Sequence, residues 1–232
     1  MHPAIQGGRV AVITGSASGI GFAAARAFAS KGLHIVLADL PTNLASAAQS
    51  IKQEFPKVKV VPVETDVSQF SALESLKKKV DSEFKGKEVG VLMFNAGTSA
   101  PTVPFARDGL DQGALRANYE KILNTNMWGV INGVQAFLPD LVKQTSPSVV
   151  ICTGSKQVPL FSARNRTNHD KGITNPPGNP AYNISKTGVK FFTESLAHDL
   201  RTNYPKSPIA VHLLIPGWVY TVFLYHASPS NL

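Results

Sequence analysis

A glycine-rich turn constrains this chain more than any other segment. The apolar stretch "RVAVIT", residues 9–14, leads into "GSASGIG", residues 15–21, and then into an alanine-rich helical stretch. Gly15, Gly19 and Gly21 permit a tight turn and a close approach of the backbone to a pyrophosphate, which the N-terminus of the following helix would attract. This order predicts a dinucleotide-binding unit, and the alternative is a tight turn without a ligand.

Short β-branched apolar stretches alternate with longer amphipathic stretches along the chain. We expect strands at 9–14, 34–39, 58–65, 89–95, 148–153 and 209–215, and helices at 21–32, 43–55, 71–84, 117–144 and 181–202. The strands are continuously apolar, as in a parallel sheet that is buried on both faces. The alternation predicts an α/β fold, with a doubly wound, mostly parallel Rossmann-type sheet in the order 3-2-1-4-5-6 and helices on both faces.

Composition limits the other possibilities. A chain of 232 residues is long enough to form one domain, 1–232, around a buried core. The net charge of +8 comes from scattered lysines, so we expect neither a nucleic-acid partner nor a membrane partner. Cys152 is the one cysteine, which excludes an internal disulfide and a cysteine metal cluster. The sequence contains no signal-peptide pattern and no apolar run of ~18 residues, and we expect a cytoplasmic protein.

Asp39 bears on the choice of cofactor. It ends the second predicted strand, eighteen residues after Gly21. A carboxylate at this point can accept the ribose hydroxyls of NAD and would repel the 2′-phosphate of NADP. No lysine or arginine lies between Gly15 and Gly21, so the sequence favours NAD over NADP. The alternative role for Asp39 is a turn residue before Pro41.

The segment "AYNISK" places Tyr182 and Lys186 four positions apart, on one face of a helix. A free tyrosine has a pKa near ~10, too high for ready proton exchange at neutral pH. A neighbouring ammonium group would favour the phenolate and lower that pKa. The pair alone does not distinguish a catalytic site from a surface pair, so the other motifs decide.

Six motifs occur in a fixed order: "TGSASGIG", "TDV" at 65–67, "NAG" at 95–97, Asn126 within a helix, "AYNISK" and "PGWVYT" at 216–221. Together they resemble the short-chain dehydrogenase/reductase family over about residues 7–157 and 172–221. The resemblance implies NAD(P)-dependent hydride transfer to or from an alcohol or ketone substrate, in a homodimer or homotetramer. It implies these cofactor-binding residues: Gly15, Ser18, Gly19, Ile20, Gly21, Asp39, Asp66, Val67, Asn95, Ala96, Gly97, Tyr182, Lys186, Pro216, Gly217, Val219 and Thr221.

The same resemblance implies four catalytic roles. Tyr182 would be the general acid or base, and Lys186 its electrostatic partner and a ligand of the nicotinamide ribose. Ser155 would donate a hydrogen bond to the reacting oxygen. Asn126 would anchor a water molecule for proton relay, and the alternative for it is a helix residue that faces solvent.

The chain departs from the family pattern in two places. Removing residues 158–171, "VPLFSARNRTNHDK", would restore the family spacing between Ser155 and Tyr182. This atypical insertion is either a surface loop over the substrate cleft or a translated intron. Residues 222–232 form an atypical, truncated C-terminus, and we expect the seventh strand to be missing, which would leave the sixth strand as an exposed edge. An alternative function follows: a catalytically impaired dinucleotide-binding isoform that acts only by binding or subunit pairing.

Overall fold

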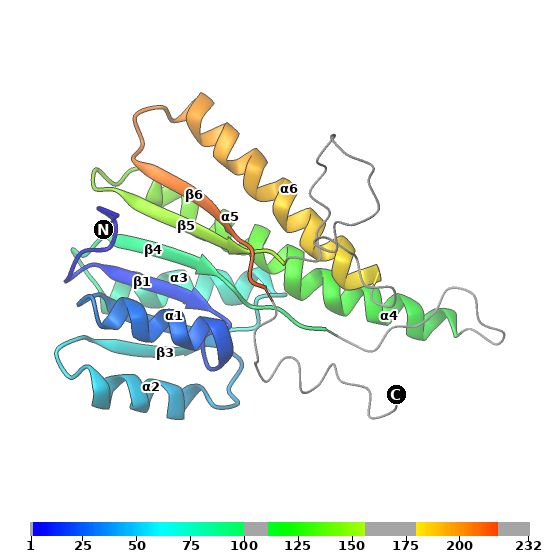
Figure 1. Cartoon of the computed structure of the whole chain (residues 1–232), viewed down its shortest axis with the longest axis horizontal. Helices are drawn as coiled ribbons and strands as arrows, with labels where there is room; N and C mark the ends of the chain where they lie inside the picture. The colour runs from blue at the N-terminus through cyan, green and yellow to red at the C-terminus, as the bar shows by residue number, and fades with distance from the viewer. Residues whose placement is uncertain (1, 100–110, 156–179, 218–232) are drawn as a thin grey trace.

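The computed structural model of the chain describes residues 2–99, 111–155 and 180–217. Six parallel strands form one sheet in the order β3-β2-β1-β4-β5-β6 (Figure 1). Their bounds are β1 Val10–Thr14, β2 His34–Asp39, β3 Val60–Glu64, β4 Val89–Phe94, β5 Ser148–Thr153 and β6 Ile209–Leu214. The predicted sheet, its order and its parallel sense are therefore confirmed.

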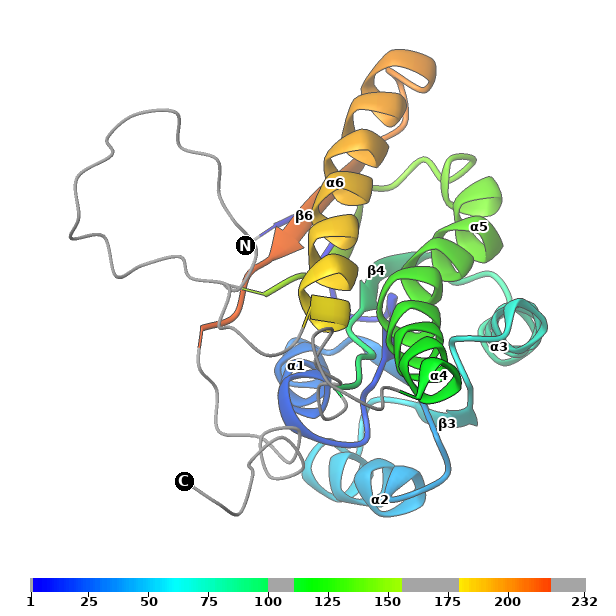
Figure 2. The same ribbon diagram turned by 90° about the vertical axis from the view of Figure 1, so that its right-hand side faces the viewer.

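Helices cover both faces of this sheet (Figure 2). Helices α1 (Gly19–Ala29) and α2 (Leu44–Glu54) lie on one face. On the other face lie α3 (Phe70–Glu83), α4 (Gln112–Leu123), a π-helical turn η1 (Asn124–Trp128), α5 (Gly129–Leu141) and α6 (Pro180–Asn203). No helix within the described ranges has both the length and the apolar character needed to cross a bilayer.

The central strands are buried because apolar side chains face helices on both sides. Every residue of β1 is buried, and so are the four middle residues of β2. This accounts for the continuous rather than alternating apolar pattern of these strands. The strand β6 differs: within the described residues its one strand neighbour is β5, and His212 and Leu214 are exposed.

One predicted helix, 117–144, is interrupted in the structure. It consists of α4, the π-helical turn η1 and α5. Short π-helical turns within α-helices occur frequently at functional sites. In this turn Asn126 is completely buried and its amide bonds to other elements, a tertiary interaction that helical periodicity does not predict.

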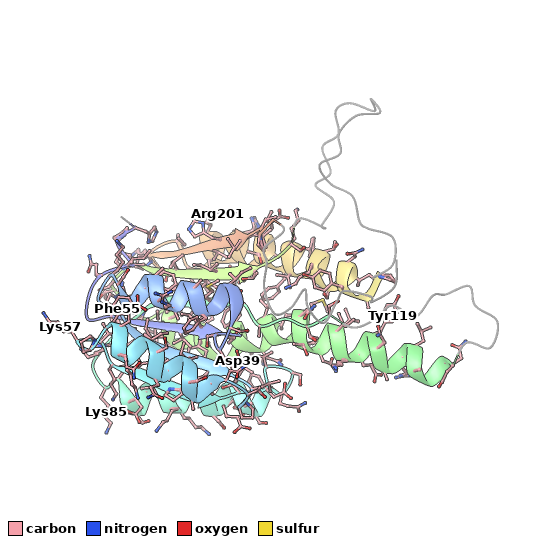
Figure 3. All side chains as sticks on the ribbon, turned by 60° about the horizontal axis from the view of Figure 1, so that its bottom comes forward. Asp39, Phe55, Lys57, Lys85, Tyr119 and Arg201 are labelled. Carbon is pink, nitrogen blue, oxygen red and sulfur yellow. The ribbon has the colours of Figure 1, made fainter. Side chains whose placement is uncertain are left out.

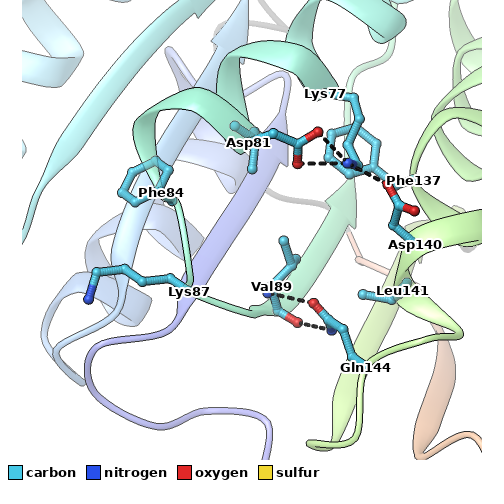
Figure 4. Close-up of a pocket in the computed structure, with 10 residues that line it drawn as sticks. Lys77, Asp81, Phe84, Lys87, Val89, Phe137, Asp140, Leu141 and Gln144 are labelled. Carbon is cyan, nitrogen blue, oxygen red and sulfur yellow. Dashed lines mark hydrogen bonds and ion pairs between the residues drawn. The ribbon is translucent and has the colours of Figure 1, made fainter.

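At the amino ends of the strands, side chains tie the elements together. Gln144 Oε1 accepts the Val89 N–H at 2.9 Å, and Gln144 Nε2 donates to the Val89 carbonyl at 3.0 Å (Figure 4). Lys77 of α3 forms ion pairs with Asp81 and Asp140. These residues line a small pocket between α3 and α5. The glycine-rich turn contributes no residue to it.

Three predictions concern residues outside the described ranges. They are the insertion 158–171, the C-terminal segment 222–232, and the cofactor contacts of Val219 and Thr221.

Candidate active site

The glycine-rich turn requires glycine for two physical reasons. Gly15 and Gly19 have φ angles of 64° and 55°, which lie in the left-handed region that favours glycine. A Cβ atom at Gly15 would lie 2.6 Å from Ala96 Cα, and one at Gly21 would lie 2.1 Å from the carbonyl oxygen of Gly15. The turn is therefore packed too closely against the end of β4 to accept a side chain at either position.

The N-terminus of α1 is open to an anion. Ser18 is its N-cap residue, in an extended conformation, and its side chain makes no capping hydrogen bond. The first turn of α1 contains no acidic residue. Its N–H groups and the positive end of the helix dipole would therefore suit a phosphate. Ile20, in this first turn, packs against the core beneath α1.

Asp39 lies beside this turn, at the carboxyl end of β2. Its Oδ2 accepts a hydrogen bond from the Ala17 N–H at 2.7 Å, and its Oδ1 accepts one from the Leu40 N–H at 2.8 Å. Asp39 thus acts as a turn residue, as the alternative interpretation had it. Each carboxylate oxygen retains a further lone pair, and the side chain is only half-buried, so it can also accept hydroxyl groups of a ligand.

Asp66 and Val67 follow β3 at the same edge of the sheet. The carboxylate of Asp66 is exposed and accepts a hydrogen bond from the Ser68 N–H at 3.0 Å. Val67 is buried, and its carbonyl accepts a hydrogen bond from Asn132 Nδ2 at 3.2 Å. Both therefore have structural roles in addition to the predicted contact with adenine.

A chain of hydrogen bonds connects the glycine-rich turn to Lys186. Asn95 Nδ2 donates to the Gly15 carbonyl at 3.0 Å, and Asn95 Oδ1 accepts from Thr153 Oγ1 at 3.2 Å. The Thr153 carbonyl in turn accepts from Lys186 Nζ at 2.9 Å. Thr14 Oγ1 fixes the start of the connection after β4, because it accepts the N–H groups of Asn95 and Ala96. These bonds thus join Gly15, Asn95 and Lys186, three of the predicted residues, in one network.

Tyr182 and Lys186 lie on the inner side of α6, not on the surface. Lys186 is 3% exposed, and its Nζ lies 5.8 Å from the centroid of the Tyr182 ring. Burial lowers the pKa of Lys186 to about 8. Burial raises the pKa of Tyr182, and a side-chain hydrogen bond with Ser155 acts in the opposite direction.

The expectation that Lys186 lowers the pKa of Tyr182 needs correction. In this structure the lysine ammonium bonds to the Thr153 carbonyl, and desolvation dominates the pKa of the phenol. Ser155, at the end of β5, is the residue that favours the phenolate.

Asn126 is buried, so the interpretation as a solvent-facing helix residue is wrong. Its Oδ1 accepts a hydrogen bond from the Thr98 N–H at 2.7 Å, and its Nδ2 donates to the Thr98 carbonyl and to Ser185 Oγ, each at 3.0 Å. Ser185 Oγ donates onward to the Tyr182 carbonyl at 2.6 Å. The amide therefore joins the segment after β4 to the turn of α6 that carries Tyr182.

Gly97 lies where these groups meet. A Cβ atom at this position would lie 3.4 Å from Asn126 Oδ1 and 3.5 Å from Lys186 Nζ. Pro216 and Gly217 follow β6 at the same edge of the sheet, and an added Cβ at Gly217 would meet no atom within 4 Å. Their contact with a cofactor stays a prediction.

Sequence reasoning missed four residues that orient the site, namely Thr14, Thr98, Thr153 and Ser185. Ser185 and Lys186 lie three and four residues after Tyr182 and therefore on the same helical face, which also carries the buried Val189 and Thr193. Polar residues within an otherwise apolar helical stripe are a usable signal of this kind. The Thr14 hydroxyl bonds to backbone groups of Asn95 and Ala96, and the backbone of Thr98 bonds to the Asn126 side chain; spacing alone does not reveal these contacts.

Comparisons with known proteins agree with this geometry. A family model described as short chain dehydrogenase matches residues 9–163. The chain is 27% identical to a 3-oxoacyl-(acyl-carrier-protein) reductase of Thermotoga maritima over 92% of this chain and 75% of that protein. It is 28% identical to human 15-hydroxyprostaglandin dehydrogenase (NAD(+)) over 94% of this chain and 70% of that protein.

Two solved structures are similar as well. One is a short chain dehydrogenase/reductase from Burkholderia phymatum in complex with NAD, with a TM-score of 0.80 and 29% identity over 98% of this chain and 71% of that chain. The other is L-sorbose reductase from Gluconobacter frateurii in complex with NADPH and L-sorbose, with a TM-score of 0.73 and 27% identity over 95% of this chain and 73% of that chain.

Proposed function

Because this chain belongs to the short-chain dehydrogenase family and is an NAD(P)-dependent oxidoreductase, we propose that it uses NAD(H) to interconvert a secondary alcohol and a ketone. The catalytic residues would be Tyr182, Ser155, Lys186 and Asn126. The observation that supports this assignment most strongly is the hydrogen bond between Ser155 and the half-buried Tyr182, at the sheet edge that also carries the glycine-rich turn.

Two parts of the cofactor, the pyrophosphate and the adenosine ribose, would be bound by described residues. The N–H groups of α1 and the turn at Gly15–Gly21 would hold the pyrophosphate, and Asp39 the adenosine ribose. When bound, NAD(H) supplies the hydride acceptor or donor.

Side chains of the protein would transfer the proton to or from the substrate oxygen. Tyr182 Oη donates a proton to the carbonyl oxygen in reduction and accepts the hydroxyl proton in oxidation, while Ser155 hydrogen-bonds the same oxygen. Lys186, whose Nζ donates to the Thr153 carbonyl, would hold the nicotinamide ribose beside Tyr182. Asn126 holds the segment carrying Thr98 against α6, so its side chain acts by positioning Tyr182, and the water relay would extend from this point.

NAD is the proposed cofactor because of charge at the carboxyl edge of the sheet. Asp39 is fixed beside Ala17. Among the described residues that connect strand ends to the following helices at this edge, there is no lysine or arginine. A 2′-phosphate beside Asp39 would therefore meet a carboxylate, and these described connections offer no compensating cation.

The alternative, a protein that binds the dinucleotide without catalysis, is not favoured by the comparisons, whose relatives are dehydrogenases and reductases. NADH fluorescence on binding, followed by turnover with a broad panel of alcohols and ketones, separates the two. We expect binding and turnover of at least one substrate class. Binding of NADH with no turnover across the panel would support the alternative and sink the proposed activity.

Residues 158–171 and 222–232 enter this proposal as parts of one domain, 1–232. The matched comparison is between the full chain and a variant that lacks 158–171. If the segment is a translated intron, the shortened chain should bind NADH equally and turn over faster. If it is a substrate loop, the shortened chain should bind NADH equally and lose turnover.

A homodimer or homotetramer in the cytoplasm is the proposed setting. Ile184, Phe191 and Trp128 are exposed on α6 and η1, with Phe191 72% exposed. Such apolar side chains are typical of a subunit contact. Sedimentation equilibrium of the wild-type chain and of Phe191→Glu tests this, because the substitution should shift the protein toward monomer.

A further inference from the structure

The two edges of the sheet differ sharply in charge. The described segments that lead into the amino ends of the strands carry one acidic residue, Glu88, and many basic ones: Arg9, Lys31, Lys57, Lys59, Lys85, Lys87, Lys143 and Lys206. The described segments that leave the carboxyl ends carry no basic residue and two acidic ones, Asp66 and Asp111. The proposed active site therefore lies at the edge whose described connections carry no lysine, and cofactor binding does not explain the lysines at the opposite edge.

Five of these lysines form one surface, which we call the basic face: Lys31, Lys57, Lys59, Lys85 and Lys87. All five are exposed, and they come from the three connections before β2, β3 and β4. Figure 3 shows Lys57 and Lys85 projecting from the same end of the molecule, beyond Phe55, with Asp39 nearer the opposite end of the sheet.

Contacts inside the basic face hold the three connections together. The Lys59 N–H donates to His34 Nδ1 at 2.9 Å, and Lys59 Nζ lies 5.0 Å from the centroid of the Phe84 ring, on which His34 stacks. Lys87 Nζ donates to the Gly8 carbonyl at 3.4 Å, and the Gly8 N–H donates to the carbonyl of Gly32, next to Lys31. These contacts fix the three connections that carry the lysines relative to one another.

Little acidic charge offsets this face. Lys59 pairs with Glu83, which also pairs with Lys79, and Glu88 lies 3.7 Å from Arg9. Across the described ranges, no carboxylate forms an ion pair with Lys31, Lys57, Lys85 or Lys87. Four exposed lysines at this edge thus have no ion-pair partner among the described residues.

We propose that the basic face is an interaction surface for an anionic lipid bilayer. Lysines carried on three connections at one sheet edge suit a surface of many phosphates and carboxylates, which they attract as point charges. Nucleic acid is the less suitable partner, because this face contributes no arginine for bidentate phosphate or base contacts. It also offers no exposed ring for stacking, since Phe84 is buried and Phe55 is half-buried.

This proposal revises the expectation of no membrane partner, which rested on the lysines being scattered along the sequence. The fold gathers them, because the amino ends of parallel strands meet at one edge. Docking through this edge would point the glycine-rich turn and Tyr182 away from the lipid. Substrate and cofactor would then enter from the aqueous side.

Vesicle co-sedimentation of the full chain tests the proposal. The probes are large unilamellar vesicles of phosphatidylcholine alone and of phosphatidylcholine with about 30% phosphatidylserine. The wild-type chain should bind only the anionic vesicles and should dissociate at about 0.5 M salt, where the Debye length is short. The double variant Lys57→Glu/Lys85→Glu should lose at least about tenfold in partitioning, because each lysine near an anionic surface contributes severalfold.

The matched control is Lys78→Glu/Lys121→Glu, which changes net charge equally. Both lysines are exposed on helices outside the basic face and form no ion pair in the described part of the chain. It should bind anionic vesicles within about twofold of the wild type. All variants should retain wild-type NADH binding, which confirms that they fold.

Three results would overturn the proposal. Equal binding to neutral and anionic vesicles would remove the electrostatic basis. Equal losses in both variants would show that net charge, and not this face, is responsible. Retention on duplex DNA that Lys57→Glu/Lys85→Glu abolishes, without binding to vesicles, would identify nucleic acid as the partner. None of these results depends on turnover, so the proposed catalytic function stands or falls separately.

Discussion

The glycine-rich turn and the Tyr182 turn of α6 meet at one sheet edge, yet they are built differently. The turn depends on the absence of side chains at Gly15 and Gly21, where backbone atoms of Ala96 and Gly15 occupy the space that a Cβ would take. The Tyr182 turn is instead held by buried polar side chains, namely Ser185 on α6, Asn126 in η1 and Ser155 after β5. Close backbone packing is local and readable from spacing, whereas the polar network depends on segments far apart in the chain.

The largest effect is expected where the backbone packs most closely. In Gly21→Ala, the new Cβ would lie 2.1 Å from the Gly15 carbonyl oxygen and 2.7 Å from Asn95 Nδ2. We expect a loss of about 3 kcal/mol in the free energy of unfolding, as for severe overpacking, and no detectable NADH binding. Denaturant unfolding and NADH fluorescence measure both quantities.

The control for this substitution is Gly86→Ala. Gly86 has a φ of 74° but nothing within 4 Å of an added Cβ, so only backbone strain is introduced. The cost should be about 1 kcal/mol, with NADH binding unchanged. Normal NADH binding by Gly21→Ala would show that the turn does not hold the cofactor as described.

A substitution in the polar network should reduce turnover more than it reduces the stability of the fold. Ser155→Ala should lower turnover about 10²–10³-fold, as for loss of one oxyanion donor, with NADH affinity unchanged. Because the Ser155 hydrogen bond lowers the pKa of Tyr182, the pH profile of alcohol oxidation should also move to higher pH. Ser75→Ala, on the exposed side of α3, is the control, and identical pH profiles for wild type and Ser155→Ala would contradict the assignment.

The buried charge of Lys186 should lower the free energy of unfolding of the wild type in a pH-dependent way. Its pKa falls from 10.5 to about 8 on folding, so between these values the unfolded chain binds more protons and the stability of the wild type rises with pH. Below pH 8 the wild type carries the full cost. Lys186→Met should therefore be more stable at pH 7 by about 2 kcal/mol, after subtraction of the lost hydrogen bond to Thr153.

Denaturant titrations of both proteins at several pH values measure this difference. The advantage of Lys186→Met should shrink as pH rises from 8 toward 10.5. A difference that is constant with pH would mean that Lys186 is not buried as a cation.

The smallest effect is expected at Asp39. Asp39→Asn keeps an oxygen for the Ala17 N–H but removes the charge that disfavours a 2′-phosphate. The ratio of kcat/KM for NADH to that for NADPH should fall about tenfold. A wild-type chain that prefers NADPH would contradict the proposed cofactor.

The sequence predicted the sheet well because its signals are local. Six apolar stretches gave six strands, two of them, 34–39 and 148–153, with the observed bounds. Asn126 was found as a motif residue, but its burial and the π-helical turn around it depend on Thr98 and Ser185, which no periodicity connects to it. The raised pKa of Tyr182 likewise follows from burial, which is a property of the packed helix and not of the Tyr–Lys spacing.

Substitution of Tyr182 by phenylalanine tests the central claim most directly. The variant keeps the ring on α6 and removes only the hydroxyl that exchanges the proton. Single-turnover hydride transfer, followed by NADH absorbance at saturating cofactor, should slow by about 10²–10⁴-fold, while NADH binds as tightly as to the wild type. Hydride transfer at the wild-type rate in Tyr182→Phe would contradict the account, because a proton would then be reaching the substrate by another route.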